Sequence, residues 1–374
     1  MITTWRGDTR ERGWRETAVD GIRVHWLSLR YSNRLGYFDR MLRFVAFAAR
    51  ASKEACRIKG DVVLATSTPL TIAIPGIYCS RRHRVPLVFE VRDLWPEIPI
   101  KLRVLRNPFL IWAARWLEKA AYRNAEQVIA LSPDMAEKIA AVRPEASVTV
   151  IPNFCDTEFF GRTQSPDARV QTLMPGPPVP TILYAGTLGY VNNVRYLVEI
   201  ARVADARNYA IKFLVVGAGR EEAEVRRLAR EHGVLGKNFF MAPPMPKERM
   251  GSLFASVDVS TSFVLDEPAL WANSANKVFD ALAAGKPVAI NHGGWLAKAI
   301  TESGAGIVLP AGHPEPAAEM FDALVHDPRR LQGMSVAALT LARSRFAADR
   351  LADQFEQVLA KAVIQFRERQ SRKP

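Results

Sequence analysis

The chain has 374 residues, 48% of them hydrophobic and 24% charged, which is typical of globular proteins and a length that predicts two domains. No run of 18 apolar residues is present, so no transmembrane helix is predicted. The net charge is +13, and residues 1–125 hold 23 Lys and Arg against 11 Asp and Glu, so nearly all of the excess lies in the first third.

The excess of basic residues in the first third favours an anionic partner there, such as a membrane surface, a lipid diphosphate or a nucleic acid. The alternative is a scattered basic surface without a partner. The three cysteines, Cys56, Cys79 and Cys155, have no metal-binding spacing and no histidine pattern. They predict free, buried thiols in a reducing compartment.

The first clear strand is predicted at residues 22–29, after the turn signal Val19-Asp20-Gly21. Apolar residues recur on one helical face over 36–58, and short strands are predicted at 61–65 and 86–91. Between these strands lies an apolar segment, 70–79, which is too short to span a bilayer.

A charged motif, Glu90-Val-Arg-Asp-Leu-Trp-Pro-Glu97, stands at the carboxyl end of the 86–91 strand, where α/β sheets place their ligands. Arg92, Asp93 and Glu97 supply charge and an acid or base, and Trp95 supplies an apolar wall. The alternative is a structural ion pair beside a packed tryptophan.

Residues 108–124 are predicted to form an amphipathic helix that mixes Trp and Leu with Arg and Lys. Tryptophan beside basic residues suits a membrane interface. The alternative is a helix packed on the core with a solvated basic face. The positive charge of this part of the chain keeps the membrane interpretation open.

A strand at 127–131, a helix opened by Ser132-Pro133 and a strand at 148–151 complete the first half. The stretch 161–180 is rich in Pro, Gly, Gln and Ser and is predicted to link two domains.

The second half opens with a strand at 181–185 and the loop Gly186-Thr-Leu-Gly189-Tyr-Val-Asn-Asn193. Glycines between a strand and a helix let backbone amides approach a phosphate. A strand at 211–216 leads into Gly217-Ala-Gly219. Glu222 stands where a dinucleotide fingerprint has its third glycine, which argues against an NAD enzyme.

Residues 273–290 predict a polar loop, a helix that ends at Gly285, and a strand at 288–290. Lys277 lies in the first helical turn, where a bound anion is favoured. Asp280 lies one turn further on and could accept hydrogen bonds from the two hydroxyls of a ribose. The alternative is that both side chains are solvated. Three residues are predicted as possible caps of this helix, namely Asn273, Ser274 and Asn276.

Four motifs in the right order resemble the GT4 family of glycosyltransferases, which has the GT-B fold. Asn276-Lys-Val-Phe-Asp-Ala-Leu-Ala-Ala-Gly-Lys-Pro-Val288 resembles its donor-site signature, with Asp280 where Glu is usual. Many relatives carry another Glu eight residues earlier, where this chain has Ala272. Val91-Arg-Asp-Leu-Trp-Pro-Glu97 resembles the WbuB-like subgroup, which assembles bacterial surface polysaccharides. The other two resemblances are Ile151-Pro-Asn-Phe-Cys-Asp156 and the loop after residue 185.

The resemblance implies an α/β GT-B fold with two doubly wound Rossmann-like domains facing a cleft. Residues 1–165 would bind the acceptor, with a C-terminal helix, 349–366, packing back on them. Residues 180–345 would bind the nucleotide-sugar donor. The N-terminal domain is expected to lack its first βαβ unit, either truly or because translation starts upstream.

The resemblance further implies a retaining glycosyltransferase that moves a sugar from a UDP- or GDP-linked donor to a lipid-diphosphate-linked saccharide. It would be cytoplasmic and peripheral on the inner face of the cell membrane, in surface polysaccharide (O-antigen) synthesis. No Asp-x-Asp occurs, so no metal and no other cofactor is expected. The candidate catalytic residues are Arg92, Asp93 and Glu97, and the candidate donor-binding residues are Gly186, Leu188, Gly189, Asn192, Gly217, Gly219, Asn276, Lys277 and Asp280.

Three other functions stay open at this point. A sugar-nucleotide epimerase of the same fold would need carboxylates at the sugar and no basic lipid-facing domain. A truncated, inactive scaffold is favoured by the missing opening unit. A nucleic-acid binder is disfavoured because no recognisable binding motif occurs, and no nucleic-acid partner is expected.

Overall fold

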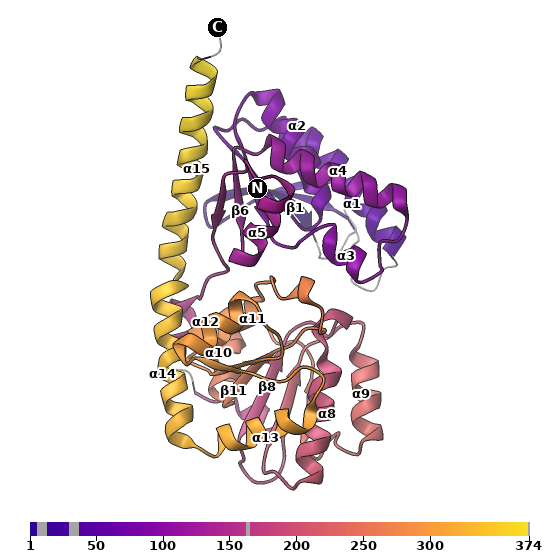
Figure 1. Cartoon of the computed structure of the whole chain (residues 1–374), viewed down its shortest axis with the longest axis vertical. Helices are drawn as coiled ribbons and strands as arrows, with labels where there is room; N and C mark the ends of the chain where they lie inside the picture. Colours follow the sequence, from indigo (N-terminus) through magenta and orange to yellow (C-terminus); the bar gives the residue numbers. More distant parts are fainter. Residues whose placement is uncertain (6–12, 30–36, 162–164, 373–374) are drawn as a thin grey trace. The chain divides into compact units, whose positions relative to one another are not determined.

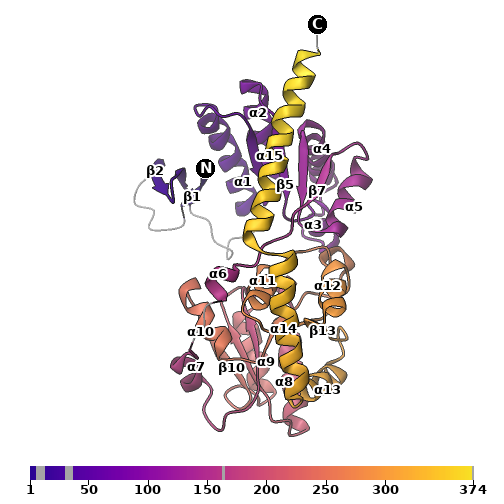
Figure 2. The same cartoon turned by 90° about the vertical axis from the view of Figure 1, so that its left-hand side faces the viewer.

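A computed structural model describes residues 1–5, 13–29, 37–161 and 165–372, and the chain forms two compact units (Figures 1 and 2). Unit 1 contains Met1–Ile151 together with Asp353–Pro374, and unit 2 contains Pro152–Ala352. Within the described ranges, no helix combines the length and the apolar character needed to cross a bilayer.

Unit 1 opens with a three-stranded sheet in the order β1-β3-β2. Strand β1 (Ile2–Trp5) runs parallel to β3 (Ile22–Ser28), and β2 (Trp14–Val19) runs antiparallel to it. The prediction that residues 22–29 form the first strand is therefore wrong. Strand β2 is mostly exposed and mixes polar with apolar residues, so its apolar pattern is weak.

A parallel four-stranded sheet forms the centre of unit 1, and its strands follow the chain order β4-β5-β6-β7. Strands β5 and β6 are almost wholly buried, as expected for a sheet covered on both faces. The strands are β4 (Val63–Thr66), β5 (Leu87–Val91), β6 (Gln127–Ala130) and β7 (Val148–Val150).

The helices of unit 1 connect and cover this sheet. The apolar segment 70–79 forms a 3-10 turn, η1 (Leu70–Ile72), and most of α2, which continues through the basic residues that follow. The helices are α1 (Tyr37–Ala55), α2 (Ala73–His83), α3 (Glu97–Lys101), α4 (Pro108–Asn124) and α5 (Pro133–Val142). Helix α5 begins as predicted, because Ser132 Oγ accepts a hydrogen bond from the Met135 amide at 3.1 Å.

Unit 2 is built on a six-stranded, fully parallel sheet in the order β10-β9-β8-β11-β12-β13. Numbered within the unit this is 3-2-1-4-5-6, so the order reverses between β8 and β11. The strands are β8 (Thr181–Ala185), β9 (Lys212–Val216), β10 (Phe239–Ala242), β11 (Val259–Ser262), β12 (Val288–Ile290) and β13 (Gly306–Val308).

Helices cover both faces of this sheet, and β8 alternates between the two cores. Ile182 and Tyr184 pack in one core with α8 (Val194–Ala206), α9 (Glu222–Glu231) and α13 (Pro314–Val325). Leu183 and Ala185 pack in the other core. That core also contains residues of α10 (Met250–Ala255), α11 (Asn276–Ala283), α12 (Trp295–Ser303) and α14 (Pro328–Arg345). Short 3-10 turns are η2 (Tyr190–Asn192), η3 (Lys247–Arg249) and η4 (Pro268–Leu270).

The stretch predicted to link two domains is part of unit 2. It contains α7 (Ala168–Leu173), follows α6 (Thr157–Phe160), and buries Val170 and Met174 in the unit 2 core. Asp167 also forms an ion pair with Arg249. The prediction of a linker is wrong because these few apolar residues are buried; its residues 162–164 lie outside the described part of the chain.

Helix α15 (Ala348–Ser371) belongs to unit 2 at its start and to unit 1 from Asp353 onward. It is longer than the predicted helix 349–366. Within unit 1, Gln127 Nε2 donates a hydrogen bond to Gln365 Oε1 at 2.7 Å, and Arg369 pairs with Glu126.

Candidate functional site

The candidate donor site lies at the carboxyl ends of β8 and β9, beside the point where the strand order of unit 2 reverses. In parallel α/β sheets this crevice is where ligands bind. Gly186 follows β8, and Lys277 in the first turn of α11 lies against it. A Cβ atom at Gly186 would stand 3.1 Å from Lys277 Nζ, so a side chain here would displace the lysine, and the φ of +156° also favours glycine.

The ammonium of Lys277 is held by Tyr184. Its Nζ donates to Tyr184 Oη at 2.9 Å and lies 4.2 Å from the centroid of the phenol ring. Burial raises the pKa of Tyr184, so the phenol stays neutral. Burial also lowers the pKa of Lys277 to about 7, and no acidic side chain of the described residues forms an ion pair with it. A buried cation without a counter-ion is costly, and a bound anion would remove that cost.

The loop after β8 has only some of its amides available. Gly186 N donates to Val216 O at 2.9 Å, and Leu188 N donates to Ala218 O at 3.0 Å. Within the described residues, the amides of Thr187 and Gly189 make no hydrogen bond. The predicted phosphate contact of this loop is therefore restricted to two amides. Asn192 is engaged in closing the loop, since its Nδ2 donates to Thr187 O at 2.7 Å.

Gly217 and Gly219 are required by the packing of two loops. A Cβ atom at Gly217 would lie 1.9 Å from Gly186 O, and one at Gly219 would lie 2.2 Å from Leu188 O. Backbone oxygens cannot yield by that much, so any side chain here would separate the loops. These two glycines therefore allow the close contact that supports the loop after β8, and their role in donor binding stays a prediction.

The start of α11 is not capped as predicted. Ala275 occupies the cap position and makes no side-chain hydrogen bond, so the prediction of a cap from Asn273, Ser274 or Asn276 is wrong. Asn276 is exposed at the first helical position. Asn273 Oδ1 and Ser274 Oγ are buried without hydrogen-bond partners among the described residues. Unpartnered polar atoms beside free helix amides suit a polar ligand.

Asp280 lies one turn along α11, and its carboxylate makes no hydrogen bond within the described chain. Burial raises its pKa to about 6; the charge of Lys247 opposes this shift and that of Asp156 adds to it. Lys247 itself pairs with Asp156 at 2.9 Å. Asp280 therefore has free acceptor oxygens, and it lies near Lys247 in the loop 243–247 that follows β10.

The turn after β12 is packed against the loop that follows β11. Asn291 is buried and bonds both the amide and the carbonyl of Val264, at 2.9 and 2.8 Å. His292 is also buried, and a Cβ at Gly293 would lie 3.0 Å from the Trp271 ring. The turn is therefore a fixed wall beside the loop that precedes α11.

The candidate acceptor residues lie in unit 1, where the carboxyl ends of β4 and β5 are adjacent. Thr68 Oγ1 donates to Asp93 Oδ2 at 2.8 Å, and Arg92 N donates to Ser67 Oγ at 3.1 Å. The Arg92 guanidinium pairs with Glu90 at 3.2 Å, which also fits the structural ion pair. Glu97 begins α3 and pairs with Lys138 at 3.6 Å, so it is engaged elsewhere.

Glu118 on α4 is an acid that the sequence analysis missed. Burial raises its pKa to about 7, the Tyr122 hydroxyl opposes this by donating to it at 3.4 Å, and the charge of Glu97 adds to it. A carboxyl group that titrates near neutrality is a candidate proton carrier. The signal was an acidic residue on the covered side of an otherwise amphipathic helix.

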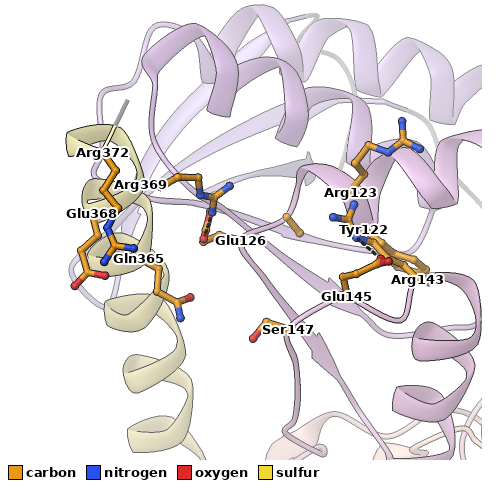
Figure 3. A pocket seen from close by; sticks show the side chains of 12 residues that line it. Tyr122, Arg123, Glu126, Arg143, Glu145, Ser147, Gln365, Glu368, Arg369 and Arg372 are labelled. Carbon is orange, nitrogen blue, oxygen red and sulfur yellow. Dashed lines mark hydrogen bonds and ion pairs between the residues drawn. The ribbon is translucent and has the colours of Figure 1, made fainter. Parts of the chain in front are cut away.

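A cavity of about 500 Å³ lies at the opposite edge of the unit 1 sheet, beside α15 (Figure 3). Two of the arginines that line it pair with glutamates, Arg369 with Glu126 and Arg143 with Glu145. None of the predicted site residues lines it. The cavity is therefore a charged seam along α15 and is separate from the carboxyl edge that carries Arg92 and Asp93.

Each half of the chain matches a different protein-family model. Residues 2–153 match the family described as Glycosyl transferase 4-like domain, and residues 179–327 match Glycosyl transferases group 1. The chain is 25% identical over 260 residues to 2-deoxystreptamine glucosyltransferase of Streptomyces kanamyceticus. That match covers 67% of this chain and 61% of the relative, so it spans about three fifths of the relative's length.

Solved structures show the fold to be GT-B, with two Rossmann-like domains. Sucrose-phosphate synthase from Thermosynechococcus elongatus aligns with a TM-score of 0.71 at 19% identity, covering 95% of this chain and 87% of that one. HepE of Anabaena, solved with UDP and glucose, aligns with a TM-score of 0.70 at 18% identity, covering 91% and 86%.

Proposed function

The chain belongs to the GT-B glycosyltransferases of the GT4 type, and on that premise we propose that it transfers a sugar from a nucleotide-sugar donor to a saccharide acceptor. The observation that carries the proposal is the half-buried ammonium of Lys277 beside Gly186, without an acidic partner among the described residues. An anionic diphosphate would supply the missing counter-charge.

The donor would lie along the start of α11. Its diphosphate would be bound by Lys277 and by the free amides of Thr187 and Gly189, and its ribose diol would donate hydrogen bonds to Asp280. UDP is the preferred nucleotide in this proposal, because the solved relative HepE of Anabaena holds UDP and, in another structure, UDP-glucose. The resemblance to GT4 enzymes supports retention of the anomeric configuration.

The chemistry follows from where charge develops. Breaking the bond between the sugar and the phosphate leaves negative charge on the diphosphate, which the Lys277 ammonium and the loop amides stabilise. In this proposal they take the place of a metal ion, so chelators leave the transfer unchanged. Arg92 and Asp93 would orient the acceptor hydroxyl.

The test is a thermal-shift titration with UDP, GDP, UDP-glucose and GDP-mannose in the presence of EDTA. Saturable stabilisation by one nucleotide series is expected, and it should be lost in Lys277→Ala and Asp280→Ala. Lys298→Ala is the matched control, because Lys298 is an exposed lysine of unit 2 that pairs with the exposed Glu302. If none of the four nucleotides stabilises the protein, the proposed donor site is refuted.

The acceptor is proposed to be a lipid-diphosphate-linked saccharide, as in the WbuB-like enzymes that assemble surface polysaccharides. Support comes from α4, where Phe109, Trp112 and Trp116 form an aromatic stripe at helical spacing; these side chains are 70%, 61% and 62% exposed. Arg115 and Lys119 are exposed on the same helix. Exposed aromatics beside basic residues fit the anionic headgroup region of the inner membrane face.

A further inference from the structure

Two cysteines and a histidine of unit 1 meet where the ends of two helices come together. Cys56 directly follows α1, and Cys79 and His83 lie on α2, one turn apart. One ligand atom from each, the two sulfurs and a ring nitrogen, lie within 4.8 Å of one another. The sequence prediction that the cysteines have no histidine partner is therefore wrong for these two.

The arrangement follows from the helix geometry. Residues four apart on a helix share one face, so Cys79 and His83 point to the same side of α2. Helix α1 packs on α2 and brings Cys56 to that side. Residues far apart in the sequence thus form one cluster that no spacing rule detects.

The polar atoms of the cluster lack strong partners. His83 Nε2 is buried without a hydrogen-bond partner among the described residues. Among the described residues, the Cys79 thiol donates a weak hydrogen bond to Ala55 O at 3.5 Å and contacts Cys56. Sulfur and imidazole ligands in one place are the donor set that suits zinc.

We propose that Cys56, Cys79 and His83 bind a Zn²⁺ ion, with a fourth coordination position left for water. Both thiols would bind as thiolates, and their protons would pass to solvent. The ion would tie the end of α1 to the end of α2, so its effect is on the stability of unit 1. It is distinct from the donor site, which lies in unit 2.

The competing chemistry is oxidation of Cys56 and Cys79 to a disulfide. Disulfide formation needs an oxidant that removes two electrons and two protons, whereas Zn²⁺ binding releases the two thiol protons and leaves the oxidation state of sulfur unchanged. The two outcomes therefore differ in the mass and in the metal content of the protein.

The experiment uses the full chain without a histidine tag, reduced and freed of metal with a chelator. Titration with Zn²⁺, or with Co²⁺ as a coloured substitute, should show one ion per chain and the thiolate-to-cobalt absorption of a tetrahedral site. Zn²⁺ should raise the thermal midpoint. Cys56→Ser and His83→Gln should each weaken binding by about a hundredfold, whereas Cys155→Ser, a buried cysteine of unit 2, should bind normally.

Two results would overturn the proposal. One is the absence of stoichiometric binding, or binding that the Cys56→Ser and His83→Gln variants retain. The other is a freshly purified protein that has lost two hydrogens by intact mass, with the loss abolished in Cys56→Ser, which would identify a disulfide. Testing the less buried Cys56 and His83 avoids reliance on Cys79→Ser, whose buried site is harder to substitute.

Discussion

Lys277 and Asp280 lie one turn apart on α11, and burial drives both toward their neutral forms. It lowers the pKa of Lys277 to about 7 and raises the pKa of Asp280 to about 6. Both groups are charged together only in a narrow range around these two values. In the proposed donor site, the bound nucleotide sugar would therefore stabilise the charged forms of Lys277 and Asp280.

This predicts that affinity for UDP-glucose is highest between about pH 6 and about pH 7. Above that range Lys277 loses its proton and its attraction for the diphosphate. Below it Asp280 is protonated and accepts the ribose hydroxyls less well. Full dependence on each charge would cost about tenfold for each pH unit outside the range.

Calorimetric titration with UDP-glucose at a series of pH values measures this dependence. UDP-glucose is suitable because its diphosphate diester does not gain or lose a proton near neutral pH. At about pH 8, titrations in buffers of different ionisation enthalpy should also show proton uptake, since the bound anion raises the pKa of Lys277. Lys277→Met should remove the uptake. A flat profile in the wild type would contradict the assigned roles.

Glu118 gives a second pH prediction, on stability. Burial raises the pKa of Glu118 from 4.5 to about 7, so the folded state holds this proton more tightly than the unfolded state. Stability is therefore lost as pH rises from about 4.5 through about 7. Glu118→Gln should be about 2 kcal/mol more stable than wild type above about pH 8, and equally stable below about pH 4.

Differential scanning calorimetry at both pH values checks this expectation. Glu137→Gln, at an exposed position on α5, is the control and should show no pH-dependent difference from wild type. A gain for Glu118→Gln that is equal at both pH values would mean that packing, and not charge, is responsible.

At the scale of elements, the contact between the loops after β8 and β9 determines the shape of the donor site. Gly219→Ala would place a methyl group 2.2 Å from Leu188 O. We expect it to destabilise unit 2 by about 2 kcal/mol and to weaken UDP-glucose binding at least about tenfold, because the Thr187 and Gly189 amides move.

Gly333→Ala is the matched control for this substitution. It lies on α14, and the added carbon would meet no atom within 4 Å beyond its chain neighbours and its own helical turn, so it should stabilise the helix by about 0.5 kcal/mol and leave binding unchanged. Chemical denaturation and nucleotide titration of both variants give the comparison. Normal binding by Gly219→Ala would show that the loop contact is dispensable.

The accuracy of the strands and helices predicted from the sequence differed from element to element. The strands 181–185 and 288–290 match the structure, because buried parallel strands are continuous apolar runs with clear ends. Strands β1 and β2 were missed because they mix polar with apolar residues, and no residue of either strand is buried. The linker at 161–180 was wrong because a few buried residues in a polar stretch leave little pattern.

The same division applies to the site. The placement of Lys277 and Asp280 on one helix followed from local periodicity, because the two residues are only three positions apart in the sequence. Which amides of the loop after β8 stay free depends on carbonyls of Val216 and Ala218, some thirty residues away. Glu118 and the Cys56–Cys79–His83 cluster likewise depend on helix packing, which one sequence does not reveal.

For the whole molecule, the basic first third and the aromatic stripe on α4 predict binding to anionic bilayers. Vesicles containing phosphatidylglycerol should retain the protein, and vesicles of phosphatidylcholine alone should retain much less. The double variant Trp112→Ala/Trp116→Ala should bind about tenfold more weakly or worse, since each indole buries apolar area at the interface.

Co-sedimentation at low and high salt measures both contributions, because salt screens the basic residues but not the indoles. Tyr190→Ala is the control, since Tyr190 is 60% exposed but belongs to unit 2. Equal retention by both vesicle types, or by the double variant, would argue against a membrane-bound acceptor.

Helix α15 also has a consequence for how the protein is made. A ribosome releases residues 1–151 of unit 1 before unit 2, yet unit 1 also includes residues from Asp353 onward, which follow unit 2 in the chain. Until then Glu126 and the fully buried Gln127 lack Arg369 and Gln365. Unit 2 is one continuous segment and can complete its fold earlier. Unit 1 therefore finishes folding after unit 2, and nascent chains are most exposed to chaperones and proteases through unit 1.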